Sequence, residues 1–397
     1  MEAHKASADS AVASVTSADG ETAGHDRDTS ALIAEVAEIV NDAYDLGEVV
    51  RVVQVFGGYV NLSFSVTTRT SGGEHTYFVR KYCPGITERE VRFEHALLNH
   101  LDRKGFRLAG RVYETKVGST FVGRQEIIAG KPTQRYFAVY EMLSGEDKYT
   151  WTQNRCTARE YESAAQTLAL FHQVVADFEP GDLGRNQPPI MHLLRTLPDV
   201  LQRYAAQANG TRFDEYYLAH LPRIRAVIER GLEIEPLLHG LPFLAVHCDY
   251  HPGNLKYVDG RVTGLFDFDW SKLDYRLFDV ALALVYFCSS WEGSDSGELR
   301  LDAAATFLGA YQGESAKATT PGPLSATEIA LLPRMMANAN LYVLHWDVSA
   351  YYGPEVADDD EYLGYLEHNV LLMEFLESHQ SELEQLTASV RLDGVSG

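Results

Sequence analysis

The feature that most constrains the fold of this 397-residue chain is the stretch between residues 247 and 279. Asp249 lies two residues after His247 and five before Asn254, and Asp267 follows thirteen residues after Asn254. A carboxylate can accept a proton, and a carboxamide oxygen with a second carboxylate can bind a hard cation such as Mg²⁺. Solvated turn residues alone would not explain this joint spacing, so the stretch is a candidate active site.

The residues between the carboxamide and the second carboxylate indicate a turn. The segment 258–261 reads Val-Asp-Gly-Arg, and Asp-Gly at the centre is typical of a tight β-hairpin. Such a hairpin carries Asn254 on one arm and Asp267 at the end of the other. The sequence therefore predicts that both oxygen ligands approach one cation.

A zinc site is the alternative interpretation of this stretch. His247, Asp249 and His251 alternate, and alternating residues of a β-strand point to one face, as metal ligands would. The Pro-Gly pair at 252–253 indicates a loop instead of a strand. No further cluster of His or Cys lies nearby in the sequence, so the oxygen site is the preferred interpretation.

The spacing from His247 to Asn254 resembles the catalytic loop His-Arg-Asp-x-x-x-x-Asn of protein kinases. The fuller pattern is similar to the aminoglycoside phosphotransferase and choline kinase superfamily, the small-molecule branch of the protein-kinase-like fold. Its members carry His-Gly-Asp-x-His-x-x-Asn, then Ile-Asp-Phe, then Asp-Leu-Ala, which reads Asp-Val-Ala at 279–281 here. Cys248 replaces the usual Gly, and Asp269 stands where many members have Gly or Glu.

This resemblance implies a reaction and a fold. ATP would donate its γ-phosphate to a hydroxyl of a small molecule, with Asp249 as base and with Asn254 and Asp267 holding Mg²⁺. The fold would be α+β and two-lobed, protein-kinase-like. A small β-rich lobe at 31–143 would bind the nucleotide, and a larger helical lobe at 144–390 would carry the catalytic loop and the acceptor-binding helices.

The acceptor is less constrained than the reaction. The run 264–284 resembles the homoserine-kinase-like group, which implies homoserine or a related amino alcohol as acceptor. An amino sugar or an aminoglycoside antibiotic is the second hypothesis, and GTP is an alternative donor. A nucleotide-binding regulator without turnover is a hypothesis of another class, but no member of the catalytic set is missing. A protein kinase is disfavoured because the gap between Asp267 and Asp279 leaves no room for a long activation segment.

A glycine-containing segment marks a candidate phosphate loop. Strand-like residues at 49–55 and 62–66 flank Gly57 and Gly58, and Asn61 follows. Glycine lets backbone N–H groups approach an anion closely, although a plain hairpin would show the same pattern. In the resembled superfamily this loop often carries Gly-Gly followed by Asn, which implies nucleotide contacts for these three residues.

The next strand offers two candidate cations for the phosphates. Arg80 and Lys81 end the strand-like segment 77–81 and point to opposite faces. The pattern of the resembled superfamily favours Arg80, with Lys81 as the alternative. In the amphipathic helix 88–101, Glu94 shares the apolar stripe and would pair with the strand cation, as in kinases.

The strand-like segment 135–142 runs into an expected hinge at 141–143. The resemblance implies that backbone groups around Met142 meet the adenine. Asp279 is expected to cap the apolar helix 280–288 and to tie down the catalytic loop. His172, near the end of the expected helix 157–178, is expected to be structural.

Composition excludes some classes of partner. The 56 acidic and 34 basic residues give a net charge of −22, which disfavours nucleic acid and suits solubility or a cationic substrate. No apolar run reaches membrane length, and four scattered cysteines suit a reducing compartment. We expect a cytoplasmic monomer or homodimer without a membrane partner. Residues 1–30 are polar and small, which predicts a disordered tail.

Overall fold

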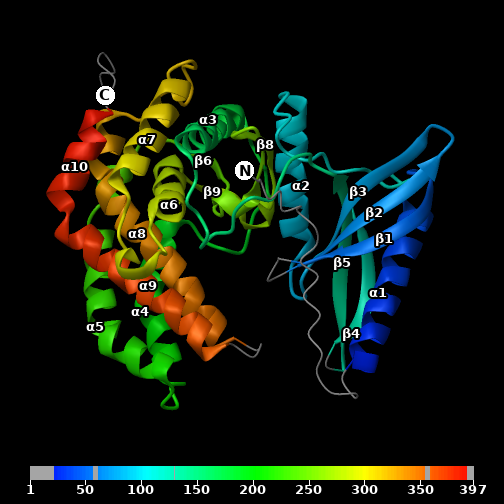
Figure 1. The fold of residues 1–397 in the computed structure, drawn as a ribbon, viewed down its shortest axis with the longest axis horizontal. Helices are drawn as coiled ribbons and strands as arrows, with labels where there is room; N and C mark the ends of the chain where they lie inside the picture. The colour runs from blue at the N-terminus through cyan, green and yellow to red at the C-terminus, as the bar shows by residue number, and fades with distance from the viewer. Residues whose placement is uncertain (1–21, 57–60, 129, 354–357, 391–397) are drawn as a thin grey trace, which may run out of the picture. The chain divides into compact units, whose positions relative to one another are not determined.

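The computed structural model describes residues 22–56, 61–128, 130–353 and 358–390. The chain forms two compact units, residues 1–84 with 113–140 and residues 85–112 with 141–397. The first is rich in β-structure and the second is mainly helical (Figure 1), so the fold is two-lobed and α+β as expected. No helix in these described ranges combines the length and the hydropathy that crossing a bilayer requires.

The first unit is a five-stranded sheet with one long helix. Its elements are α1 (Thr22–Ala43), β1 (Glu48–Val55), β2 (Leu62–Thr70), β3 (Gly73–Lys81), β4 (Val122–Ile128) and β5 (Lys131–Glu141). The strands lie in the order β1-β2-β3-β5-β4, and the β1–β2, β2–β3 and β4–β5 pairs are antiparallel. Apolar residues of α1 and of β2, β3 and β5 form the core, including Val36, Ile39, Val40, Phe64, Val66, Val79 and Phe137.

Two segments of the chain differ from expectation. The helix α1 begins at Thr22, so residues 22–30 are helical instead of part of a disordered tail. Adding turns to a helix that already packs on a sheet costs far less than starting a new helix. The sequence at 109–113 predicts a strand, but the structure has only isolated bridge residues there, at Ala109 and Val112.

The second unit contains most of the helices. They are α2 (Glu88–Arg103), α3 (Ala158–Val174), α4 (Ile190–Ala205), α5 (Arg212–Leu232), α6 (Arg276–Cys288), α7 (Leu301–Ser315), α8 (Ala326–Tyr351), α9 (Asp359–Ser378) and α10 (Gln380–Ser389). Its short strands are β6 (Phe243–Val246), β7 (Leu255–Val258), β8 (Arg261–Leu265) and β9 (Lys272–Tyr275), which pair as β6–β9 and β7–β8.

The helix α2 groups with the second unit, although the sequence suggested the small lobe. Its buried face explains this grouping. The ring of Phe93 lies 5.8 Å from that of Phe178, and His100 Nε2 lies 2.9 Å from the carbonyl of Val174. These contacts tie α2 to the end of α3 and to the residues that follow it.

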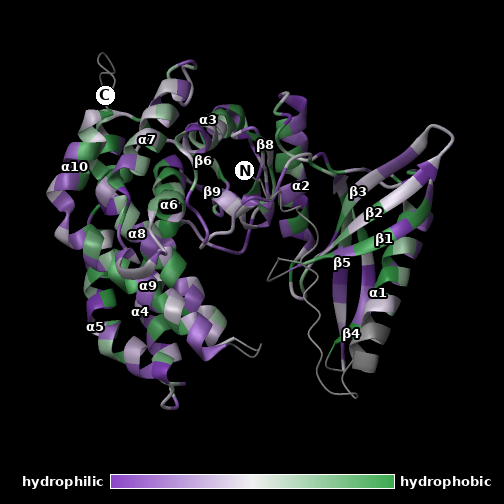
Figure 2. Cartoon of the chain, in the orientation of Figure 1, coloured by the Kyte–Doolittle hydropathy of each residue, from purple (hydrophilic) through white to green (hydrophobic). Residues whose placement is uncertain are grey.

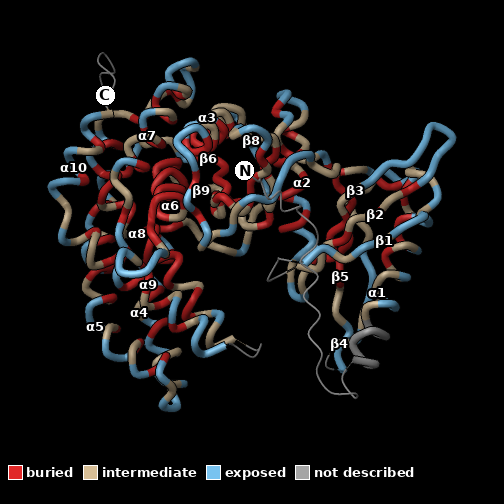
Figure 3. Tube along the Cα trace, in the orientation of Figure 1, coloured by how far each residue is buried: buried red, intermediate tan, exposed pale blue. Residues whose placement is uncertain are grey.

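The helix α6 is the buried centre of the second unit. Twelve of its thirteen residues are buried, and it is coloured mainly as hydrophobic in Figure 2 and as buried in Figure 3. Other helices begin with reciprocal capping boxes, as at Thr157 with Glu160 and at Ser325 with Glu328. These local signals set helix starts, and burial of the apolar faces holds the helices around α6.

Candidate active site

The stretch 247–267 forms a loop followed by a hairpin, as predicted. The loop follows β6 and enters β7 through a short 3₁₀ turn, Pro252–Asn254. The β7–β8 hairpin turns at Asp259 and Gly260, which have φ of 49° and 72°. Positive φ at both central residues matches the right-handed twist of the two strands. The hairpin therefore carries Asn254 on one side and leads to Asp267 on the other.

Asp249 and Asn254 are directly hydrogen-bonded. Asn254 Nδ2 donates to Asp249 Oδ2 at 2.8 Å and to the Asp249 carbonyl at 2.9 Å. Both amide hydrogens are thus used to fix Asp249, so the orientation of the carboxamide is defined. The other polar atom of the side chain, Oδ1, is the type of atom that a hard cation prefers.

Asp249 is held in its ionised form. Burial disfavours the charge, but the neighbouring His251 and the amide of Asn254 favour it. Together these groups hold the pKa of the Asp249 carboxyl below its ordinary value. His251 Nε2 lies 3.6 Å from Asp249 Oδ2. An ionised, fixed carboxylate suits a group that orients a hydroxyl and accepts its proton.

His247 connects the loop to the segment that ends at Asp267. Its Nε2 lies 3.0 Å from the carbonyl of Phe266, and its Nδ1 accepts from the backbone N–H of Asp249 at 3.3 Å. Burial lowers the pKa of this imidazole, so it is neutral and carries its proton on Nε2. The N–H of Phe266 donates to the Asn254 carbonyl at 3.1 Å. The two candidate metal ligands are therefore coupled through Phe266.

Two residues of the loop adopt the left-handed backbone conformation. Cys248 has φ of 69°, and Asp267 has φ of 68° with ψ of 60°. This region costs a residue with a side chain about 1–2 kcal/mol. The cost at Cys248 gives a physical reason for the glycine that the resembled pattern usually has there. Asp tolerates the conformation better than most residues, and it turns the chain at the end of β8.

Asp279 anchors the loop, as predicted, but does not cap its helix. Its Oδ2 and Oδ1 accept from the backbone N–H groups of His247 and Cys248, each at 2.9 Å. It lies within the first turn of α6, whose N-cap is Tyr275. Because Asp279 lies inside the helix, its carboxylate points at the loop. It accepts hydrogen bonds from backbone N–H groups of the loop, whereas a cap would accept them from the first N–H groups of the helix.

His172 is structural, as predicted. It is fully buried on α3, with Nε2 3.0 Å from Asp279 Oδ2 and Nδ1 2.8 Å from the Tyr311 hydroxyl. Burial lowers its pKa, so the neutral ring donates to Asp279 through Nε2 and accepts from Tyr311. These two hydrogen bonds hold Asp279 between α3 and α7.

Lys81 has structural partners within the first unit. Its Nζ lies 2.8 Å from Glu35 Oε2 of α1 and also forms an ion pair with Glu126 of β4. Arg80 is buried among aromatic rings, with its guanidinium carbon 5.8 Å from the ring centre of Phe78. Because Lys81 is already paired with two carboxylates, Arg80 is the preferred phosphate contact, which stays a prediction.

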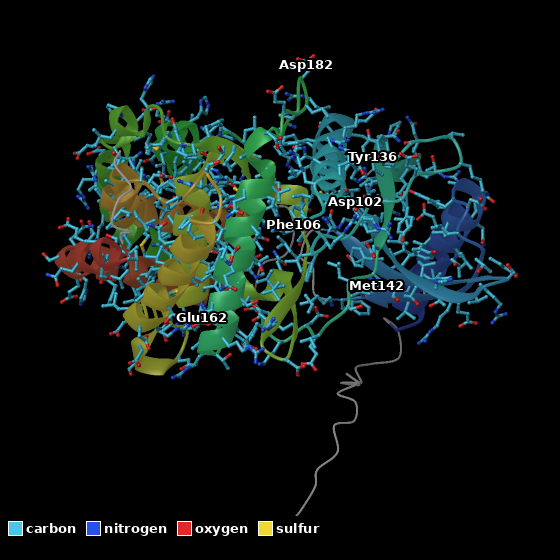
Figure 4. The ribbon with its side chains drawn as sticks, turned by 90° about the horizontal axis from the view of Figure 1, so that it is seen from above. Asp102, Phe106, Tyr136, Met142, Glu162 and Asp182 are labelled. Carbon is cyan, nitrogen blue, oxygen red and sulfur yellow. The ribbon has the colours of Figure 1, made fainter. Side chains whose placement is uncertain are left out.

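The other nucleotide candidates are less defined. Gly57 and Gly58 lie outside the described residues. Asn61 accepts a hydrogen bond from the N–H of Cys83 at 2.8 Å, which links β2 to the end of β3. Glu94 is buried on α2 within the second unit. Met142 is half-buried directly after β5 and is labelled in Figure 4. Their contacts with a nucleotide stay predictions.

Tyr286 is a neighbour of Asp249 that the sequence pattern does not reveal. Its ring lies 5.5 Å from that of His251, and burial and then the charge of Asp249 raise its pKa. Tyr286 stands in the apolar run of α6, which sequence patterning interprets only as a buried helix. The signal that could have found it is a hydroxyl within such a run.

The residues present fit a magnesium ion better than zinc. Among the described residues, no three His, Cys, Asp or Glu side chains form a group that could hold a metal. Mg²⁺ keeps several waters and takes one or two carboxylates from a protein, with the rest from phosphates. Asn254 and Asp267 would supply this small set, and their binding of a cation stays a prediction.

Comparison with known proteins identifies a family and several similar proteins. Residues 51–317 match the model of the Phosphotransferase enzyme family. The chain is 28% identical over 294 residues to a homoserine kinase of Polaromonas naphthalenivorans, which covers 73% of this chain and 79% of the relative. A solved microcompartment-associated aminopropanol kinase has a TM-score of 0.63 at 17% identity and covers 88% of this chain and 98% of its own. An amicoumacin kinase in complex with AMP-PNP and Ca²⁺ has a TM-score of 0.59 at 16% identity and covers 92% and 96%.

Proposed function

Because the chain belongs to the phosphotransferase enzyme family and is a small-molecule kinase, we propose that it transfers the γ-phosphate of Mg·ATP to the hydroxyl of a homoserine-like amino alcohol. The observation that carries the proposal is the ionised Asp249, fixed by both amide hydrogens of Asn254. Phosphoryl transfer needs positioning and charge neutralisation more than covalent chemistry from the protein.

Asp249 and its neighbours perform the proton chemistry in this proposal. The acceptor hydroxyl donates a hydrogen bond to the Asp249 carboxylate. As the hydroxyl oxygen bonds to the γ-phosphorus, the bond from that phosphorus to the β,γ-bridging oxygen breaks. ADP leaves with the bridging oxygen, and the hydroxyl proton passes to Asp249 and then to solvent.

Asn254 Oδ1 and the Asp267 carboxylate would hold Mg²⁺, which neutralises phosphate charge when bound. Arg80 would contact the phosphates from the end of β3. Gly57, Gly58 and Asn61 would belong to the phosphate loop.

Homoserine is the preferred acceptor for two reasons. The relative with 28% identity is named homoserine kinase, and the match covers 79% of its length. The net charge of −22 also favours an acceptor that carries an ammonium group.

The test is an assay of ADP release with Mg·ATP and a panel of acceptors. The panel contains L-homoserine, choline, methylthioribose, amino sugars and aminoglycosides, and Asp249→Asn is the inactive control. We expect turnover with L-homoserine that the variant abolishes. Turnover restricted to an amino sugar would replace homoserine with an amino sugar as the acceptor. Nucleotide binding without any turnover would indicate a regulator.

A further inference from the structure

Arg185 is a buried arginine with unsatisfied hydrogen-bond donors. It lies in the segment between α3 and α4, and 8% of its side-chain surface is exposed. Its Nε and Nη1 are closed to solvent and have no hydrogen-bond acceptor among the residues that the structure describes. Leaving buried donors of a charged group unsatisfied is costly, so such a group commonly has a binding role.

The nearest carboxylate does not satisfy this guanidinium. Glu90 Oε1 lies 3.8 Å from Arg185 Nε, beyond hydrogen-bond distance. The Glu90 oxygens already accept from the backbone and hydroxyl of Thr87 at 3.0 and 2.7 Å. They also accept from the backbone and side-chain amides of Asn186 at 3.1 and 3.0 Å. Glu90 therefore balances the charge of Arg185 while its own hydrogen bonds hold the neighbouring residue.

The segment around Arg185 is fixed at several points. Lys272 Nζ donates to the carbonyl of Pro188 at 2.7 Å, and the N–H of Ile190 donates to Asp274 at 2.8 Å. On the N-terminal side of Arg185, the carbonyl of Asp182 accepts a hydrogen bond from Arg89 at 2.8 Å. Asp182 is labelled in Figure 4. Arg185 is thus held in place before any ligand arrives, which lowers the entropic cost of binding.

Arg185 lies next to the catalytic segment. Its guanidinium carbon is 5.7 Å from the ring centre of Trp270, the third residue after Asp267. Trp270 packs on Trp346 of α8, with ring centres 4.8 Å apart. A guanidinium that lies over an indole face keeps its edge N–H groups for a planar acceptor, and a carboxylate matches that edge with two parallel hydrogen bonds.

A hydrogen bond also joins the segment around Arg185 to α8. Gln187 donates to the hydroxyl of Tyr342 at 2.9 Å. Burial raises the pKa of Tyr342, and the nearby Cys248 and Tyr286 contribute to the rise. Cys248 directly precedes Asp249, and Tyr286 faces it. Gln187 therefore links the segment that carries Arg185 to Tyr342, which has Cys248 and Tyr286 among its neighbours.

We propose that Arg185 binds the carboxylate of the acceptor, so that the substrate is a hydroxy amino acid and not an amino alcohol without an acid group. This inference rests on the proposed function and narrows it. Arg185 is a specificity-determining residue that contacts the end of the acceptor remote from the reacting hydroxyl.

The test compares two acceptors that differ only in the carboxylate. L-homoserine and 3-aminopropan-1-ol share the hydroxyl, the carbon spacing and the amine. We expect wild-type kcat/KM to favour L-homoserine by about 100-fold, because the buried N–H donors of Arg185 stay without an acceptor when the carboxylate is absent. In Arg185→Met the preference should fall to within about 3-fold, mainly through KM for L-homoserine, while turnover of 3-aminopropan-1-ol changes little.

Two further variants separate binding from folding. Arg185→Lys keeps a charge without the planar fork and should retain a preference of roughly 10-fold. Arg225→Met removes a half-buried arginine of α5 that donates to the carbonyl of Pro198. It should leave the ratio between the two acceptors at the wild-type value.

The outcomes distinguish this inference from the function beneath it. A wild-type preference below about 3-fold, or an unchanged preference in Arg185→Met, overturns the inference while phosphoryl transfer stands. If Arg185→Met does not fold, the inference is tested by the kcat/KM ratio between the two acceptors in the wild type and in Arg185→Lys. No turnover of any acceptor in the panel overturns the proposed function and this inference together.

Discussion

At the scale of single residues, the polar side chains of the candidate site are held by defined hydrogen-bond partners. Asn254 uses both amide hydrogens on Asp249, and His247 uses one ring nitrogen on Asp249 and the other on Phe266. Because each group is held by a defined partner, small substitutions should act on the chemistry more than on the fold.

Replacing Asp249 with Asn tests the catalytic assignment. The variant keeps the shape and can still bond to the Asn254 side chain, but it loses the charge that orients and deprotonates the acceptor. We expect kcat to fall by about 10²–10³ or more, with the melting temperature nearly unchanged. Product formation measured with labelled ATP checks this, and near-normal turnover would refute the role of Asp249.

The pH dependence of the reaction follows from the same carboxylate. Because the pKa of Asp249 is held below its ordinary value, the group stays ionised as the pH falls from 8 to about 5. We expect kcat/KM to be flat over this range and to fall only at lower pH. A rate profile with buffers of constant ionic strength measures it. An enzyme-dependent decrease between pH 6 and 7 would contradict the assignment.

The sequence marks the candidate catalytic residues more clearly than the proposed substrate contact. Asp249, Asn254 and Asp267 follow one spacing within a short stretch, so pattern alone suggests them. Arg185 has no such pattern, because its burial depends on Glu90 and Trp270, which are distant in the chain. Such a residue is found only once the chain is folded.

At the scale of helices and strands, local signals set most boundaries. The Asp-Gly turn was readable from the sequence, and the β7–β8 hairpin confirms it. The start of α1 at Thr22 and the isolated bridges at 109–113 were not, because no local signal in the sequence marks them. Alternation along β3 also gave no reason to choose between Arg80 and Lys81 as the phosphate contact. The ion pairs of Lys81 with Glu35 of α1 and Glu126 of β4 distinguish the two residues.

The start of α3 offers a test of one such signal. Glu160 accepts from the Thr157 backbone and from Lys148 and Tyr149, at 2.8, 2.6 and 2.7 Å. Burial opposes its charge, but these donors, Lys148 first, lower the Glu160 pKa from 4.5 to about 2. A lowered pKa stabilises the fold above pH 4.5, and this stability is lost as the pH falls toward 2.

We expect Glu160→Gln to cost on the order of 3 kcal/mol at pH 7, with the difference from wild type shrinking below pH 4. Urea unfolding at several pH values measures this. Glu88→Gln is the matched control, since that side chain is half-exposed and pairs with Arg92 four residues on. It should cost about 0.5 kcal/mol or less. Equal effects in the two variants would rule out the special role of Glu160.

At the scale of the whole molecule, a buried ion pair joins the centre of the second unit to its longest described helix. Arg276 at the start of α6 and Glu328 at the start of α8 are each 1% exposed. Arg276 Nη2 donates to both Glu328 oxygens, and Nη1 donates to the carbonyl of Gly322 at 2.6 Å. Nothing in the sequence pattern marked this pair.

Removing one charge of this pair should destabilise the protein strongly. Glu328→Gln leaves the Arg276 guanidinium buried without a counter-charge, and we expect a loss of about 3–5 kcal/mol. Denaturant unfolding with activity recorded on the folded fraction measures it. Glu292→Gln, in the exposed pair with Arg155, should cost about 1 kcal/mol or less. A loss for Glu328→Gln as small as for the control would contradict the prediction.

The anchoring of the catalytic loop by Asp279 has a consequence for how this enzyme can change. Asp279 and His172 attach the loop to α6 and α3, whereas Arg185 and Trp346 come from other segments. In the proposed function, the candidate base and the proposed acceptor contact therefore lie on separate segments of the second unit. We expect substitutions near residue 185 to change the acceptor while the catalytic loop keeps its anchors.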